Sequence, residues 1–156
     1  MKDDDRTPPH KVRFTKLQEA QIEYLLSVEG ACTAMYHELG FDAAEVPARN
    51  EKDFYRLPRD HAVRVVEADD QVAGYAAWRD EAPGVVYLEE LSIHPEYQRF
   101  GLATKLLGRV MEEAREGNFG QVVLRMWDRA PWAKSFYEKA GFKDVDDNAP
   151  PKVREW

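Results

Sequence analysis

Hydrophobic and polar positions along the chain follow two spacings, one of two residues and one of three to four. Residues 12–17 alternate roughly apolar with polar side chains, and three more strand-like runs follow closely at 62–68, 72–78 and 85–93. A spacing of two is typical of strands, because successive side chains point to opposite faces of a sheet. Polar residues at 69–71 and around 81–84 separate the last three runs, so the pattern predicts consecutive strands joined by tight turns.

The helical spacing occurs in three segments. Residues 19–39 carry apolar side chains every three or four positions, and Gly30 within them predicts a break into two helices, with Gly40 as the C-cap. An apolar stripe over residues 102–114 predicts a helix of about four turns. Residues 128–141 are expected to form the last helix, because they start with a capping pattern and proline and end at a glycine.

The remaining segments complete the expected order of elements. Residues 41–60 are polar and contain Pro47 and Pro58, which predicts a long loop. A short strand is expected at 122–126, and at most one more strand beyond Phe142. The order β-αα-βββ-α-β-α-β predicts an α/β fold with helices on both faces of the sheet.

Length and composition indicate one globular domain. The chain has 156 residues, 44% hydrophobic and 33% charged, which is ordinary for such a domain. We expect residues 1–9 to form a disordered tail and residues 10–156 the domain. No apolar run approaches the ~20 residues that span a bilayer, and the polar N-terminus does not resemble a secretory signal. The single cysteine, Cys32, excludes an intrachain disulfide and suits a reducing compartment, so a cytoplasmic location is expected.

The net charge and the spacing of the histidines restrict the kinds of ligand that are expected. The net charge of −7 argues against general nucleic-acid binding, which needs a basic surface, and would suit a cationic substrate such as an amine. The four histidines are scattered without the spacing of metal ligands: His10, His37, His61 and His94. No metal site is therefore expected.

The segment with the most chemical information joins the strand at 85–93 to the helix at 102–114. It reads Gln-Arg-Phe-Gly-Leu-Ala over residues 98–103. Backbone N–H groups in the first turn of a helix have no partners within the helix, so they can bind an anion. Gly101 lacks a Cβ where the backbone must approach a ligand, and Gln98 and Arg99 can add side-chain donors. The nucleotide-triphosphate and dinucleotide glycine motifs are both missing, so we interpret the turn as a phosphate-binding site of another kind.

Two motifs together resemble the GNAT superfamily of N-acetyltransferases. One is Gln/Arg-x-x-Gly-x-Gly/Ala, matched by Gln98, Gly101 and Ala103, and the other is Phe-Tyr-Glu-Lys-Ala-Gly-Phe at 136–142. The resemblance implies the GNAT fold, a mixed and mostly antiparallel central sheet, with acetyl-CoA as co-substrate. It also implies that the turn holds the pyrophosphate while residues 91–93 contact the pantetheine arm. The expected coenzyme-binding residues are Leu91, Ser92, Ile93, Gln98, Arg99, Phe100, Gly101, Leu102, Ala103 and Thr104.

Acyl transfer to an amine also needs proton transfer. An alkyl amine with a pKa near ~10 is only about 0.1% neutral at pH 7, so a base helps the attack and an acid helps the thiolate leave. Glu89 and Glu90 lie in an otherwise apolar strand, and we expect only one to face the acyl centre. The similarity of Tyr-Leu-Glu-Glu at 87–90 to a motif of diamine acetyltransferases favours Glu89 slightly. The alternative for either is a rim carboxylate paired with an arginine.

The last expected catalytic residue is Tyr137. By the resemblance it protonates the leaving thiolate, although its place in a helical apolar stripe also suits a core residue. Many family members carry an asparagine seven residues earlier, where this chain has Ala130. That contact to the pantetheine is therefore absent or made by another group.

The expected function is acetyl transfer from acetyl-CoA to a primary amine by direct attack in a ternary complex. The acceptor would be a small-molecule or peptide amine, and the protein could form a homodimer, as superfamily members often do. The alternative is a CoA-binding sensor or regulatory module of the same fold without turnover. Whether the acyl group is acetyl or larger stays open.

Overall fold

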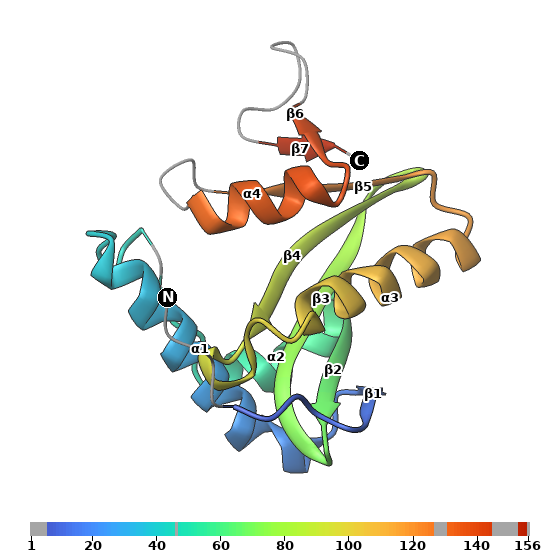
Figure 1. Cartoon of the computed structure of the whole chain (residues 1–156). Coiled ribbons are helices and arrows are strands. Elements are labelled where there is room, and N and C mark those ends of the chain that lie inside the picture. Colours follow the sequence, from blue (N-terminus) through green and yellow to red (C-terminus); the bar gives the residue numbers. More distant parts are fainter. Residues whose placement is uncertain (1–5, 46, 127–130, 145–152, 156) are drawn as a thin grey trace.

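The computed structural model describes residues 6–45, 47–126, 131–144 and 153–155 (Figure 1). The strands are β1 Val12–Lys16, β2 Ala62–Ala68, β3 Gln71–Ala82, β4 Val85–Ile93, β5 Gln121–Arg125, β6 Lys143–Asp144 and β7 Val153–Glu155. The α-helices are α1 Ile22–Glu38, α2 Glu51–Asp60, α3 Leu102–Glu116 and α4 Pro131–Lys139. Two short 3-10 helices, η1 Glu19–Gln21 and η2 Pro95–Tyr97, precede α1 and α3.

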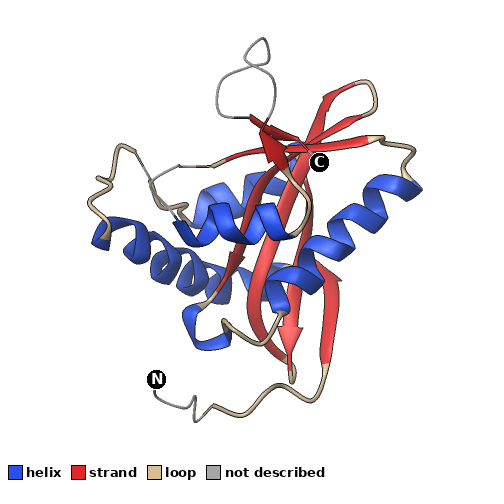
Figure 2. Cartoon of the chain, turned by 45° about the horizontal axis from the view of Figure 1, so that its top comes forward, coloured by secondary structure: helices blue, strands red, loops and turns tan. Residues whose placement is uncertain are grey.

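The strands form one sheet in the order β1-β2-β3-β4-β5-β7-β6, and every pair is antiparallel except β4 with β5. Figure 2 shows helices on both sides of this sheet. One face carries a core in which Leu25 of α1 and Phe54 of α2 are fully buried. A larger core around α3, with Leu106 and Val110 fully buried, covers the other face. The predicted fold class, an α/β layer with a mostly antiparallel sheet, is confirmed.

The pairing of β4 changes along its length. On one side it pairs with β3 from Val85 to Ile93, whereas on the other side it pairs with β5 only from Val85 to Leu88. Figure 1 shows the two parallel strands diverging beyond that point. Within the described segments, residues 89–93 of β4 therefore have a sheet edge that no strand covers.

A β-bulge lies at the place where the two strands part. Leu88 is opposite Trp78 and Glu90 is opposite Ala77, so Glu89 is an extra residue in β4. A bulge interrupts the strict alternation of side chains between the two faces. The rule that adjacent residues face opposite ways therefore does not apply to Glu89 and Glu90.

Two predictions about the helices on the first face are wrong. Helix α1 runs without a break through Gly30, whose position is open to solvent space. Its fully buried Leu25 and nearly fully buried Val28 pack on the sheet, and this packing outweighs the low helix propensity of one glycine. The predicted loop 41–60 contains helix α2.

Helix α2 forms despite Pro58 because its start is strongly capped. Asn50 Oδ1 accepts a hydrogen bond from Asp53 N at 3.0 Å, and Asp53 Oδ2 accepts one from Asn50 N at 2.8 Å. This reciprocal pair is a capping box. Phe54 and Leu57 are buried one turn apart, and Pro58 stands near the end of the helix.

The chain ends also differ from the prediction in part. Two short strands, β6 and β7, follow Phe142, where at most one strand was expected. The expected helix start at 128–130 lies outside the described residues, and the described helix begins at Pro131. The expected disordered tail, residues 1–9, stays a prediction for residues 1–5, which lie outside the described part, whereas Arg6 contacts the domain.

Candidate functional site

The turn between η2 and α3 has two residues in the left-handed region of backbone space. Arg99 has φ 73° and Gly101, the N-cap of α3, has φ 76°. The first backbone hydrogen bond of the helix is donated by Lys105 N to Gly101 O at 3.1 Å. Among the described residues, no hydrogen bond is made by the six backbone N–H groups of residues 99–104. Six unpaired amides around one helix start are a site for an anion.

The side chains of this turn fall into two groups. Leu102 is buried and anchors the helix in the core, while Phe100 and Ala103 are partly buried against the same core. Arg99, Gly101 and Thr104 are exposed. A Cβ built on Gly101 would meet nothing within 4 Å, so protein packing does not require glycine there. The requirement comes from the positive φ and, in our interpretation, from a ligand.

Gln98 has a different role from the one predicted. Its Nε2 donates to Ile93 O at 2.9 Å, so its amide ties the turn to the end of β4. The expectation that Gln98 offers a side-chain donor to the ligand does not fit this geometry. Arg99 remains exposed beside the unpaired amides.

Particular backbone N–H and C=O groups point to the uncovered edge of β4. Ile93 O faces this edge, because it accepts from Gln98 and from Cys32 Sγ at 3.3 Å. Backbone groups two residues apart on a strand point to the same edge, so Leu91 presents its N–H and C=O there as well. Ser92 O lies instead against β3, where a Cβ on Gly74 would be 2.2 Å from it. Of the predicted residues 91–93, Leu91 thus has the backbone groups available for an extended ligand.

Both predicted carboxylates meet one guanidinium group. Arg49 Nη2 lies 3.1 Å from Glu89 Oε2 and 3.6 Å from Glu90 Oε1. Glu89 Oε2 also lies 2.8 Å from His61 Nε2. The two carboxylates therefore reach the same side of the sheet, whereas strict alternation predicted opposite sides; the bulge at Glu89 is the cause.

Arg49 is held by a buried network on α1 and β3. Glu29 Oε1 accepts from Arg49 N at 3.1 Å, and Glu29 Oε2 accepts from the Tyr75 hydroxyl at 2.8 Å. Glu29 is only 6% exposed and Tyr75 is fully buried. A buried carboxylate needs such partners, since its desolvation is otherwise costly.

Glu90 has the most perturbed acidity of these carboxylates. Burial, followed by the nearby charge of Glu29, raises the pKa of Glu90 to about 7, although Arg49 and a hydrogen bond from Ser92 Oγ at 3.2 Å oppose the shift. Glu89, in contrast, is in direct contact with two basic side chains. The bulge thus presents one carboxylate in ion pairs and another that titrates near neutral pH.

Two tyrosines are close enough to Glu90 for its charge to affect them. Burial raises the pKa of Tyr137 well above its ordinary value, and the charges of Tyr36 and Glu90 add to the shift. Burial, followed by Glu90, also raises the pKa of Tyr36. Tyr137 packs edge-on against Phe136 and Phe142, with ring centroids 5.0 and 5.4 Å apart. Both phenols therefore keep their protons at neutral pH.

The single cysteine lies close to this group but is unreactive by its environment. Burial and the charges of Glu29 and Glu90 raise the pKa of Cys32 to about 12. Its thiol donates to Ile93 O. A thiolate nucleophile is not formed under these conditions.

The predicted site residues therefore divide into two neighbouring parts. The unpaired amides of 99–104 and the edge at Leu91 form the first, and Glu89, Glu90 and Tyr137 form the second. Sequence reasoning missed four residues of the second part: Glu29, Arg49, His61 and Tyr75. The only local signal was a glutamate on the apolar side of a helix, since the rest come together from distant segments.

Among the described residues, no group of three or more His, Cys, Asp and Glu side chains could hold a metal ion. None of the helices within these segments has the length and apolar character needed to cross a bilayer.

A family model matches most of the chain. Residues 31–142 match the acetyltransferase (GNAT) family. The chain belongs to the GNAT family. No curated protein gives a significant match.

Solved GNAT structures share the fold at low sequence identity. The PaiA N-acetyltransferase of Thermoplasma acidophilum, solved with coenzyme A, has a TM-score of 0.76 and 18% identity, over 93% of this chain and 98% of that one. The ribosomal-protein-S18-alanine N-acetyltransferase of Escherichia coli has a TM-score of 0.70 and 16% identity, over 93% and 90%. An aminoglycoside acetyltransferase from an uncultured soil metagenomic sample, solved with sisomicin, has a TM-score of 0.66 and 14% identity, over 89% and 93%. At these identities the similarity concerns the fold.

Proposed function

We propose that this GNAT protein is an N-acetyltransferase that moves the acetyl group of acetyl-CoA to a primary amine by direct attack in a ternary complex. The observation that carries the proposal is the run of six unpaired amides at 99–104, continued by the uncovered edge of β4 toward Glu90. A diphosphate at the first feature and an extended thioester arm along the second would direct the acyl carbon toward the carboxylates. Membership of the GNAT family and the CoA complex of the Thermoplasma structure support this assignment.

Glu90 is our choice for the proton acceptor. A general base works best when its pKa is near the working pH, and Glu90 titrates at about 7. Glu89, favoured slightly by the sequence motif, is already paired with Arg49 and His61, which suits a positioning role. In the proposed step the amine nitrogen bonds to the thioester carbon, and Glu90 accepts the amine proton directly or through water.

Tyr137 is our choice for the proton donor. The C–S bond breaks as the tetrahedral intermediate collapses, and the leaving thiolate then takes a proton. The partly buried Tyr137 keeps its proton at neutral pH, because desolvation raises its pKa and the charge of Glu90 adds to the shift. Its ring also packs against the core beneath α4, so Tyr137→Phe, which keeps the ring, isolates the contribution of the hydroxyl.

The acceptor is proposed to be a small cationic amine, with a peptide amine as second choice. Three carboxylates, Glu29, Glu89 and Glu90, lie around Arg49, and the chain carries a net charge of −7. Such a field concentrates cations near the site. Relatives act on both kinds of acceptor, since one structural neighbour is bound to sisomicin and another is a ribosomal-protein-alanine acetyltransferase.

The deciding experiment is a thiol-release assay over a panel of diamines, polyamines, aminoglycosides and peptides. Isothermal calorimetry with CoA first establishes coenzyme binding. Release of CoA that depends on one amine, together with an acetylated product in mass spectrometry, supports the proposal. CoA binding without release on any amine, and without an effect of Glu90→Gln or Tyr137→Phe, would favour the sensor alternative.

The remaining proposals concern the setting of the enzyme. We place it in the cytoplasm, without a resident metal and without nucleic acid or a membrane as partner, on the composition and charge described above. A homodimer is compatible with the family. Size-exclusion chromatography with light scattering measures the oligomeric state directly.

A further inference from the structure

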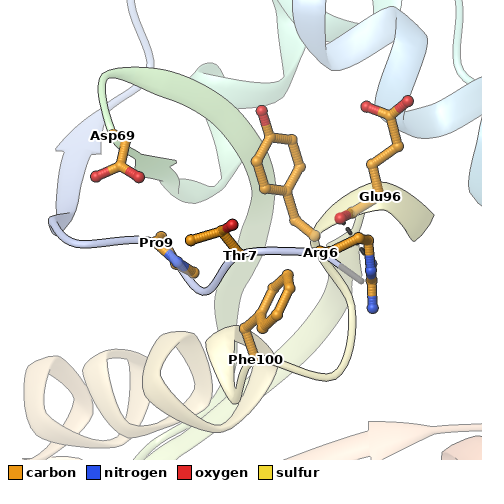
Figure 3. Close-up of a pocket in the computed structure, with 7 residues that line it drawn as sticks. Arg6, Thr7, Pro9, Asp69, Glu96 and Phe100 are labelled. Atoms are coloured by element: carbon orange, nitrogen blue, oxygen red, sulfur yellow. Dashed lines mark hydrogen bonds between the residues drawn. The ribbon is translucent and has the colours of Figure 1, made fainter. Parts of the chain in front are cut away.

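The N-terminal segment reaches the turn that precedes α3 through one arginine. Arg6 Nη1 donates to Pro95 O at 3.1 Å and to Glu96 O at 2.7 Å, and Arg6 Nη2 donates to Gln98 O at 2.8 Å. The guanidinium carbon also lies 4.7 Å from the centre of the Phe100 ring. Figure 3 shows Arg6 between Glu96 and Phe100, on the wall of a cavity of about 340 Å³.

Two of these carbonyls, Glu96 O and Gln98 O, have no backbone donor among the described residues, whereas Pro95 O also accepts from Gln98 N at 3.3 Å. Pro95 and Glu96 belong to η2, and the carbonyls at the end of a short helix have few partners within the helix. A cation is favourable at this end of a helix. The planar guanidinium offers several N–H groups in a fixed arrangement, which allows it to bind three carbonyls and an aromatic ring together.

The contacts of Arg6 lie on both sides of Arg99, the non-glycine residue of the turn that has a left-handed backbone. Arg99 has φ 73°, a conformation that costs a non-glycine residue about 1 kcal/mol. Arg6 binds the carbonyl oxygen of Gln98, the residue before Arg99. Its guanidinium group also lies over the ring of Phe100, the residue after Arg99. Both contacts therefore favour the conformation in which the N–H groups of 99–104 stay unpaired.

The segment that carries Arg6 is itself tied to the sheet. Asp69, in the turn between β2 and β3, accepts from Lys11 N at 2.8 Å and from His10 N at 3.0 Å. Asp69 N donates in turn to Lys11 O at 2.8 Å. Arg6 is thus four residues from an anchored point, which limits its freedom when it binds the turn.

We propose that Arg6 is a positioning residue that pre-organises the 99–104 amides for the diphosphate of CoA, an inference that rests on the proposed function. Its two Nη atoms are engaged with main-chain carbonyls, so its effect reaches the ligand through the turn. Pre-organisation raises affinity by removing the cost of ordering a loop during binding. The predicted tail would then be a part of the coenzyme site at its last four residues.

The test compares Arg6→Ala, Arg6→Lys and the control Lys16→Ala, which removes a positive charge from an exposed position of β1. We expect Arg6→Ala to raise the Kd for CoA about tenfold, with kcat at saturating acetyl-CoA within about twofold. Arg6→Lys keeps the charge without the planar fork and should resemble Arg6→Ala, whereas Lys16→Ala should match the wild type. Restoration of full affinity by lysine would show that charge alone acts and would overturn the proposal.

Two further readouts separate this inference from the proposed function. With S-acetylpantetheine, which has no diphosphate, Arg6→Ala and the wild type should show the same KM. In the ligand-free protein, hydrogen exchange of the Gln98 and Lys105 amides should be faster in Arg6→Ala, because their hydrogen bonds depend on the ordered turn. If the wild type fails to bind CoA, the proposed function fails, and this exchange experiment still decides whether Arg6 orders the turn. Unchanged exchange rates of these two amides would contradict the proposal that Arg6 orders the turn.

Discussion

At the scale of single residues, the two adjacent glutamates show how position changes chemistry. Glu89 contacts Arg49 and His61, while Glu90 lies among protein atoms beside Glu29 and Ser92. Glu90 titrates near neutral pH because burial is the largest cause of its raised pKa. These two environments occur at adjacent positions of β4 because Glu89 is the extra residue of the bulge.

Glu90→Gln should reduce kcat/KM roughly 10²-fold, since a general base contributes at least that much. In the wild type, kcat/KM should rise with pH and show an inflection near 7, where Glu90 becomes ionised, in addition to the inflection of the amine. The variant should lose that inflection and keep only the one that belongs to the amine. Steady-state rates from pH 5.5 to 9 measure both effects.

Glu116→Gln is the matched control for this change, because it removes an exposed carboxylate at the end of α3. It should leave the rate and the pH profile unchanged. An inflection near pH 7 that persists in Glu90→Gln would assign the base to another group.

Gly101→Ala tests the turn at its positive φ. The alanine should cost about 1 kcal/mol of folding stability, because it must adopt a left-handed conformation. Its Cβ meets no protein atom within 4 Å and would project toward the bound diphosphate, so the Kd for CoA should rise about tenfold or more.

Gly108→Ala provides the comparison within the same helix. Position 108 is also open within 4 Å but has helical backbone, so alanine should stabilise the protein by about 0.5–1 kcal/mol without changing the Kd for CoA. Calorimetry and denaturant unfolding measure the two quantities. Equal Kd values for both variants would argue against a diphosphate at the turn.

At the scale of elements, packing overrides local signals on the face covered by α1 and α2. Gly30 indicated a helix break, yet α1 continues because Leu25 and Val28 bury their side chains against the sheet. Pro58 indicated a loop, yet α2 forms from a capping box and two buried apolar residues. A capping pattern of Asn50 with Asp53 was visible in the sequence and is the signal that would have found α2.

Gly30→Ala should therefore stabilise the protein by about 0.5–1 kcal/mol, because a continuous helix favours alanine over glycine at an open position. A break at residue 30 with left-handed backbone would give the opposite sign. Urea unfolding with far-UV circular dichroism, at constant m-value, measures the difference. Activity should not change.

At the scale of the whole molecule, the site lies where two halves of the sheet separate. Strands β4 and β5 pair over only four positions, and the freed part of β4 lies between α1 and the turn before α3. Leu91 at the uncovered edge and the two glutamates at the bulge thus belong to one strand. Folding also places the Glu90 carboxylate in surroundings that disfavour its charge, so global stability is linked to its protonation.

Glu90→Gln should raise folding stability at high pH. The folded pKa of about 7 lies above the unfolded value of 4.5, so between these values the folded state binds more protons. The Glu90 contribution to wild-type stability is therefore fully favourable below about pH 4.5 and is lost as pH rises to 7. The variant minus wild-type difference should grow over that window to roughly 1–3 kcal/mol. Unfolding curves at pH 5 and pH 8 measure it, and a constant difference would contradict the raised pKa.

The turn before α3 and the strands beside it could be predicted because their signals are local. The turn at 98–104 needs a glycine and a helix start, and both are written in consecutive residues. The strands β2, β3 and β4 were predicted from alternation, and the apolar stripe of α3 from its period of three to four residues. The surroundings of Glu89 and Glu90 could not be predicted in this way, since Arg49, His61 and Tyr75 come from separate segments.

The sequence by itself determined the family, the order of most elements and the position of the glycine turn before α3, because each depends on residues that are close together in the chain. Only the tertiary structure decided that Glu89 and Glu90 share a side, that Arg49 lies between them, and that Arg6 holds the turn. These facts depend on a bulge, on burial and on contacts across as many as 92 residues of chain. Such contacts form through packing of the whole domain, and no local pattern encodes them.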